Sequence, residues 1–147
     1  MGNSYVKLGI ALFLSLIVMF VLTMSMIVTI DHFYFNWSNL WMAIIMVAPM
    51  GIIMLAVMGG MFENGRLNLA LFAAFAGIFA GAFFLGRAET FVGDEGFLRS
   101  MIPHHSRAIL VCEEASITDP EIIELCDQIV ETQREEIRQM EEILERY

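Results

Sequence analysis

The sequence has few basic residues and none of the common hydrolase motifs. Eight Lys and Arg residues stand against seventeen Asp and Glu residues, which gives a formal net charge of −9. Because phosphate binding requires a basic surface, this balance argues against nucleic acid as a partner. No Gly-x-Ser-x-Gly, His-Glu-x-x-His or phosphate-binding glycine loop occurs, so hydrolytic chemistry has no support.

Charged residues are also absent from three long apolar runs, residues 8–30, 40–62 and 67–86. Each run can cross about 30 Å of hydrocarbon at about 1.5 Å per residue. Hydrophobic residues make up 58% of the chain and the mean hydropathy is +0.68, too apolar for a soluble globule of this size. We therefore predict three transmembrane helices within a membrane anchor at residues 1–87, with the lipid bilayer as a partner.

The interior of the predicted spans indicates packing more than transport. No span carries an acid or a base at mid-depth, which disfavours a proton relay or an ion channel. In the third span, Ala73, Gly77 and Gly81 form a small-residue face that lets a neighbouring helix approach closely. The second span repeats methionine every four residues from Met42 to Met58. This row fits either flexible helix contacts or a thioether path for copper.

The positions of the basic residues predict the orientation of the chain. Lys7 precedes the first span and Arg66 lies between the second and third, whereas the loop at residues 31–39 has no Lys or Arg. The positive-inside rule then places the C-terminal region outside. Arg87, just past the third span, argues mildly against this orientation. In a bacterium, this location is the periplasmic side of a multi-pass inner-membrane protein.

Residues 88–147 form a separate and strongly acidic domain. They carry five Arg against fifteen Asp or Glu residues, a balance of −10. Apolar residues recur at helical spacing over residues 97–111 and again over 123–144. Asp119 followed by Pro120 is a strong signal for the start of the second helix. We predict an extramembrane antiparallel helical hairpin.

The chemistry of this domain is concentrated around two adjacent histidines. Met101 precedes His104 and His105 by about one helical turn, and a thioether with two imidazoles suits Cu(I). Residues 104 and 105 point about 100° apart on a regular helix, so they can equally be polar core or interface residues. Gln133, a polar residue in the apolar row of the second helix, is predicted to bond one imidazole. His32 is either an auxiliary metal contact or a solvated loop residue.

Cys112 and Cys126 are the two cysteines of the chain. The hairpin brings them onto neighbouring turns, and an oxidising compartment permits a disulfide. However, packed helices with axes about 8–10 Å apart usually hold Cα atoms too far apart for that bond. We therefore expect two small buried residues, which could add thiolates to a copper site if reduced.

Three ordered segments of the C-terminal domain resemble the family known as domain of unknown function 305. They are Phe97–Ile109 (Phe-Leu-Arg-Ser-Met-Ile-Pro-His-His-Ser-Arg-Ala-Ile), Asp119–Ile122 and Gln133–Met140. That family has a ferritin-like helical fold, and some extracytoplasmic members are associated with copper binding and copper resistance. The resemblance implies four metal ligands and one supporting residue, namely Met101, His104, His105 and Met140, with Gln133 in support.

The ligand pattern implied by this resemblance favours copper over iron or zinc. Ferritin-like di-iron sites place a Glu three residues before each ligating His, whereas Met101 holds that place before His104. A thioether in place of a carboxylate moves the preference toward Cu(I). Fuller family members hold two hairpins and this chain holds one. We therefore predict an all-α protein in which two chains, or a higher homo-oligomer, complete a ferritin-like four-helix bundle.

Two functions are compatible with the sequence. The first is a membrane-anchored Cu(I)-binding protein for metal sequestration or tolerance on the extracytoplasmic face, with a copper-handling protein as a further partner. The second is a structural or interaction module that oligomerises or recruits a membrane partner without metal. Catalysis is not favoured, although the sequence neither supports nor excludes a redox enzyme that uses bound copper.

Overall fold

The computed structural model describes residues 2–147, and no strand occurs among them. The prediction of an all-α fold is therefore confirmed. The α-helices are α1 (Gly2–Thr23), α2 (Trp37–Val57), α3 (Gly65–Arg87), α4 (Asp94–Glu114) and α5 (Pro120–Leu144). Two short 3₁₀ turns, η1 (Ile30–His32) and η2 (Gly59–Met61), lie in the connections. The chain divides into two compact units.

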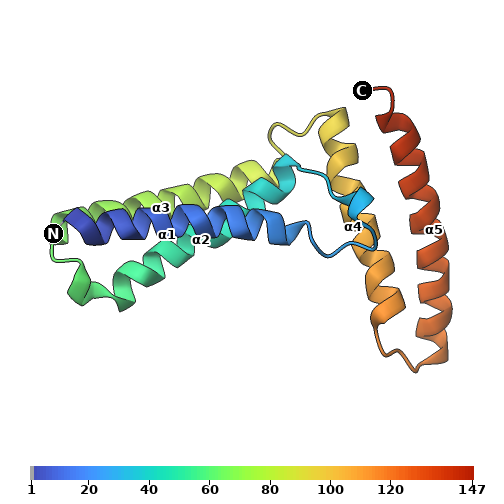
Figure 1. Cartoon of the computed structure of the whole chain (residues 1–147), viewed down its shortest axis with the longest axis horizontal. Coiled ribbons are helices and arrows are strands. Elements are labelled where there is room, and N and C mark those ends of the chain that lie inside the picture. The colour runs from blue at the N-terminus through green and yellow to red at the C-terminus, as the bar shows by residue number, and fades with distance from the viewer. Residues whose placement is uncertain (1) are drawn as a thin grey trace. The chain divides into compact units, whose positions relative to one another are not determined.

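The first unit comprises residues 2–23 and 38–90. Its helices α1, α2 and α3 follow one another in alternating directions (Figure 1). They share an apolar cluster, to which α1 gives Leu8 and Leu12, α2 gives Val47 and Leu55, and the η2 region gives Phe62. The stretches Asn3–Thr23, Trp37–Val57 and Gly65–Arg87 are long and apolar enough to cross a membrane. Residues 2–147 thus contain three candidate membrane spans, although the first ends at Thr23 and not at Ile30.

The closest approaches between α2 and α3 occur at two glycines. A Cβ atom on Gly51 would lie 2.9 Å from the ring of Phe75, and one on Gly86 would lie 2.9 Å from Cβ of Trp41. By contrast, Cβ atoms on Gly77 and Gly81 would meet nothing within 4 Å. Close packing of the face of Ala73, Gly77 and Gly81 within this unit is therefore not observed at the two glycines, and its packing between chains stays a prediction. The close contacts between α2 and α3 occur instead at Gly51 and Gly86, where a Cβ atom would collide with an aromatic side chain of the other helix.

The second unit comprises Met24–Trp37 and Phe91–Tyr147. Helices α4 and α5 lie side by side and antiparallel (Figure 1), which confirms the single predicted hairpin. Their buried cluster consists of Leu98, Ile102, Ile109, Ile137 and Met140. Association of two such hairpins into a four-helix bundle stays a prediction.

Residues 24–37 belong to this second unit, although the sequence placed them with the membrane anchor. The backbone N–H of Val28 donates to Oγ of Ser106 in α4 at 2.8 Å, and Met24 is fully buried. These contacts satisfy backbone groups that would otherwise continue the hydrogen bonding of α1. The apolar run at residues 8–30 is therefore divided: its first part forms α1 in the first unit, and its last part packs against α4 in the second unit.

The ends of the hairpin helices show how the turn is made. Asp119 accepts hydrogen bonds from the N–H groups of Glu121 and Ile122, so the predicted cap of α5 is confirmed. Helix α4 ends where Ala115 becomes extended, and it begins after Gly93. Asp94 is the first helical residue, where its negative charge stabilises the helix N-terminus.

Candidate functional site

The histidine segment of α4 follows a proline that lies inside the helix. Pro103 has no N–H, so the carbonyl of Arg99 one turn earlier loses its usual helical donor. Nδ2 of Asn36 reaches this carbonyl at 3.4 Å, and Asn36 is itself 7% exposed. The segment 24–37 thus docks where the proline has left a backbone acceptor open.

His105 is held between two acceptors. Its Nδ1 lies 2.7 Å from the carbonyl oxygen of Met101, and its Nε2 lies 2.9 Å from Oε2 of Glu136 on α5. A carbonyl and a carboxylate oxygen can only accept, so both contacts are hydrogen bonds when both ring nitrogens carry a proton. In this state the ring links α4 to α5 as an imidazolium.

Gln133 reaches this histidine indirectly. Its Nε2 donates to the same Oε2 of Glu136 at 3.2 Å, so the carboxylate stands between the amide and the ring of His105. The predicted direct bond from Gln133 to an imidazole is therefore wrong. The hairpin register places Glu136, three residues further along α5, opposite His105.

His104 points differently from its neighbour. It is exposed, whereas the side chain of His105 is 12% exposed, yet the two ring centroids lie 5.8 Å apart at 68°. A metal–nitrogen bond of about 2 Å puts an ion roughly 3 Å from a ring centre. Two imidazoles that share an ion from opposite sides would therefore have centroids about 6 Å apart. The separation of the rings alone permits a shared ion, but both nitrogens of His105 face other acceptors.

The two predicted thioether ligands contribute to the hairpin core. Met140 is buried in the α4–α5 cluster, and the partly buried Met101 packs against the same cluster. Both methionines thus belong to one apolar region, and the rings of the two histidines lie beside each other. Nε2 of His105, however, faces Glu136 and not a thioether. Within residues 2–147, no three His, Cys, Asp or Glu side chains are grouped to hold a metal ion.

The third histidine has a role that the sequence did not indicate. Nδ1 of His32 lies 2.8 Å from Oγ of Ser106, and its Nε2 lies 3.8 Å from Oε1 of Glu141. With a side chain 16% exposed, His32 is not the solvated loop residue that one interpretation expected. Ser106 is fully buried and also accepts the N–H of Val28. The sequence did carry a signal for this contact, because Ser106 is a polar residue in an otherwise apolar row of α4.

Cys112 and Cys126 form a disulfide, so the expectation of two unbonded seam residues is wrong. Their Cα atoms lie 5.4 Å apart, within the range that a disulfide requires. The estimate from packed helix axes fails here because the two residues flank the turn, where the chain draws the helices together. Both cysteines are half-buried rather than buried.

Comparisons with known proteins identify the C-terminal part of the chain. The family model described as "Domain of unknown function (DUF305)" matches residues 84–144, which confirms the resemblance of this region. A similar protein is "Uncharacterized protein L153" of Acanthamoeba polyphaga mimivirus, 38% identical over 61 residues. That alignment covers 40% of each chain, so the chain spans less than half the length of this relative. No solved structure matches the chain.

Proposed function

From the DUF305 domain at residues 84–144 and the three apolar helices before it, we propose a membrane-anchored protein that binds Cu(I). Its role is to sequester the ion on the extracytoplasmic face, the periplasmic side of a bacterial inner membrane. The observation that carries the proposal is the contact between the rings of His104 and His105 in a hairpin whose core includes Met140, with Met101 packed against it.

The donor set suits the ion. Thioethers and neutral imidazoles are ligands that Cu(I) accepts, whereas the hard carboxylates of a di-iron site are absent from these positions. His104 is exposed and can take up an ion directly. His105 can contribute Nε2 only after Glu136 is displaced, so copper binding competes with this contact.

The disulfide and the basic residues support the same orientation. Disulfides persist in oxidising compartments, and Cys112 is bonded to Cys126 in the hairpin. Lys7 and Arg66 favour a cytoplasmic N-terminus and second loop, which also sends residues 88–147 outward. The two arguments rest on different residues and agree.

Titration of the purified full chain in detergent with Cu(I), against a competing chelator, tests the proposal. The variant His104→Ala/His105→Ala is expected to lower the affinity at least tenfold, and Met140→Leu should also lower it while conserving volume. Met24→Leu is the matched control, because Met24 is a buried methionine of the same unit outside the proposed ligand set. Unchanged affinity in the histidine variant contradicts the proposal.

A second candidate function is association through the hairpin without metal. Apolar side chains near the turn remain exposed, namely Val111, Ile122, Ile123 and Leu125. A second copy of the hairpin would cover such side chains and complete a four-helix bundle. Analytical ultracentrifugation of the full chain in detergent tests this candidate. It predicts a dimer that Ile123→Glu dissociates, whereas a monomer in the wild type would contradict it.

A further inference from the structure

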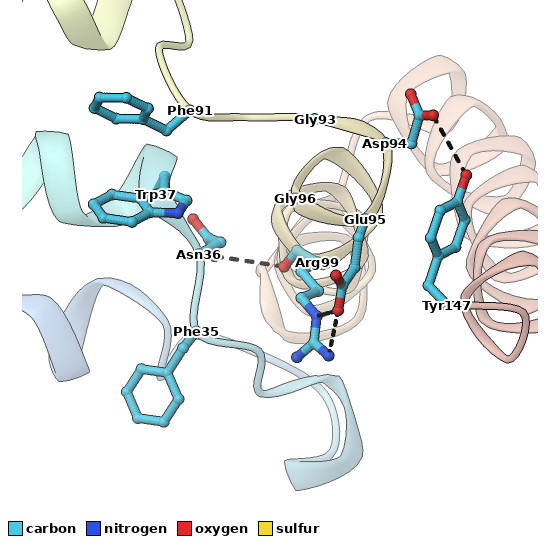
Figure 2. Close-up of a pocket in the computed structure, with 10 residues that line it drawn as sticks. All are labelled: Phe35, Asn36, Trp37, Phe91, Gly93, Asp94, Glu95, Gly96, Arg99 and Tyr147. Atoms are coloured by element: carbon cyan, nitrogen blue, oxygen red, sulfur yellow. Dashed lines mark hydrogen bonds and ion pairs between the residues drawn. The ribbon is translucent and has the colours of Figure 1, made fainter.

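Recesses of the second unit differ in what their walls offer to a ligand. In the recess at the N-terminal end of α4, the guanidinium of Arg99 is already paired with Glu95 (Figure 2). Another recess, of about 480 Å³, lies beside the turn of the hairpin and is lined by Cys112 and Cys126. Its wall therefore contains a covalent bond that a thiol can break.

The disulfide in this wall can be reduced by exchange with a dithiol. Both cysteines are half-buried and line the recess. A thiolate of the dithiol attacks one sulfur and forms a mixed disulfide, which the second thiol of the dithiol then resolves. The hairpin gains two electrons and two protons, and the dithiol loses them as it becomes a disulfide. The product is a hairpin with two neighbouring thiols.

The backbone holds these two thiols at a separation that suits one ion. The Cα atoms of Cys112 and Cys126 lie 5.4 Å apart in the bonded state. Rotation about each Cα–Cβ bond moves the sulfurs apart without moving a helix, and two metal–sulfur bonds of about 2.3 Å can span the gap. Binding releases both thiol protons, because the thiolate is the metal ligand. The ion thus takes the place of the broken bond.

The number and type of donors favour Cu(I) over zinc. Thiolates are soft ligands, which select Cu(I). Zinc in a structural site almost always takes four ligands. Within residues 2–147, however, no three His, Cys, Asp or Glu side chains are grouped to hold an ion. A pair of thiolates is therefore too small a set for zinc and is sufficient for a monovalent d¹⁰ ion.

This position is separate from the proposed histidine site. Cys112 follows His105 by seven residues on α4, which places the two about 10 Å apart along the helix axis. Two ligands of one ion must lie within about 5 Å of each other, since each metal–ligand bond is about 2 Å long. The thiols therefore form a second site and do not add ligands to the first.

The charges around the recess favour entry of a cation. Asp127 and Glu131 line it and are exposed. Glu113 also lines it and is paired with Arg134 at 2.6 Å. Three carboxylates and one guanidinium give a local balance of −2. Such a rim attracts a monovalent cation toward the sulfurs.

We propose that reduction of the disulfide between Cys112 and Cys126 converts this end of the hairpin into a second Cu(I) site, with the two thiolates as ligands. The proposal does not rest on the histidine site, because it uses other residues. An oxidising compartment favours the bonded form, which offers no thiolate. Copper uptake at this site therefore depends on a dithiol reductant.

A count of the Cu(I) bound by the full chain in detergent, with and without prior reduction, tests this proposal. The chain is reduced with dithiothreitol, freed of it without oxygen, and titrated with Cu(I) against a competing chelator. The reduced wild type is expected to bind one equivalent more than the oxidised wild type, with a new ultraviolet band from Cu(I)–thiolate bonds. Cys112→Ser/Cys126→Ser should show neither the extra equivalent nor the band.

The double serine variant also lacks the disulfide, so it is the matched control for loosening of the hairpin. Extra copper in this variant after the same treatment would overturn the proposal, as would equal binding by reduced and oxidised wild type. Alkylation of the reduced wild type with iodoacetamide gives a second check and should remove the extra equivalent. In the background His104→Ala/His105→Ala the extra equivalent should persist, which distinguishes failure of this site from failure of the histidine site.

Discussion

Nε2 of His105 lies 2.9 Å from Oε2 of Glu136, and this contact joins the two helices of the hairpin. The opposite nitrogen of the ring donates to the carbonyl of Met101. One ring therefore joins the two helices of the hairpin and is also a proposed metal ligand. The same two residues link the stability of the hairpin with the proposed copper binding.

Replacement of Glu136 by Gln should lower the free energy of unfolding by about 1 kcal/mol, because it removes the charge opposite His105 while keeping an acceptor. The groups in contact with this ring are the carbonyl of Met101, the ring of His104 and Glu136 from α5.

Chemical unfolding of the full chain in detergent, followed by circular dichroism, measures this effect. Glu135→Gln is the matched control, because Glu135 pairs only with Arg138 on the exposed face of α5 among the contacts described. An equal loss of stability in both variants would show that general charge, and not the pair with His105, is responsible.

The disulfide should contribute to the stability of the hairpin. Cys112 and Cys126 are separated by 14 residues, and closure of a loop of this size is worth about 3 kcal/mol in the chain-entropy view. The double variant Cys112→Ser/Cys126→Ser should therefore unfold at a lower temperature than wild type under non-reducing conditions. With a reductant present the two proteins should become equal within about 1 kcal/mol, and a difference that persists would contradict the account.

Asn36 and Pro103 should be coupled energetically. Asn36→Ala leaves the carbonyl of Arg99 without this donor and is expected to cost about 1–2 kcal/mol. In the background Pro103→Ala, the new N–H of residue 103 can bond that carbonyl, so the same change should cost about 1 kcal/mol less. A double-mutant cycle of unfolding free energies measures the coupling. Strict additivity would show that Asn36 acts elsewhere.

Substitution of alanine for each of two glycines of α3 should change the stability of the first unit in opposite directions. A Cβ on Gly86 would lie 2.9 Å from Cβ of Trp41, the stem of a side chain whose Nε1 donates to the carbonyl of Thr90. Gly86→Ala should therefore destabilise the first unit by about 1–3 kcal/mol. Gly77→Ala meets nothing within 4 Å and should be neutral or slightly stabilising. Thermal unfolding in matched detergent distinguishes the two, and equal effects would contradict the observed α2–α3 contact.

The sequence predicted the features that depend on local signals. The three apolar runs, the cap at Asp119 and the single hairpin follow from hydropathy, capping chemistry and helical spacing, and each is present in the structure. The domain resemblance rested on an ordered combination of residues around His104 and His105, and the family match over residues 84–144 confirms it.

The sequence did not predict the features that depend on long-range contacts. The first apolar run ends as a helix at Thr23 because Val28 and His32 find Ser106, which lies more than 70 residues away. The partner of His105 depends on the register of α4 against α5, which brings Glu136 and not the expected Gln133 to the ring. The disulfide depends on how closely the helices approach beside that turn, which helix spacing alone does not give.

X-ray absorption at the copper edge of the Cu(I)-loaded full chain tests the central claim most directly. The account predicts both sulfur and nitrogen neighbours around the ion. Sulfur should be lost in Met101→Leu/Met140→Leu, and nitrogen should be reduced in His104→Ala/His105→Ala. A spectrum with only nitrogen or oxygen neighbours, or one that neither variant changes, would contradict copper binding by these four residues.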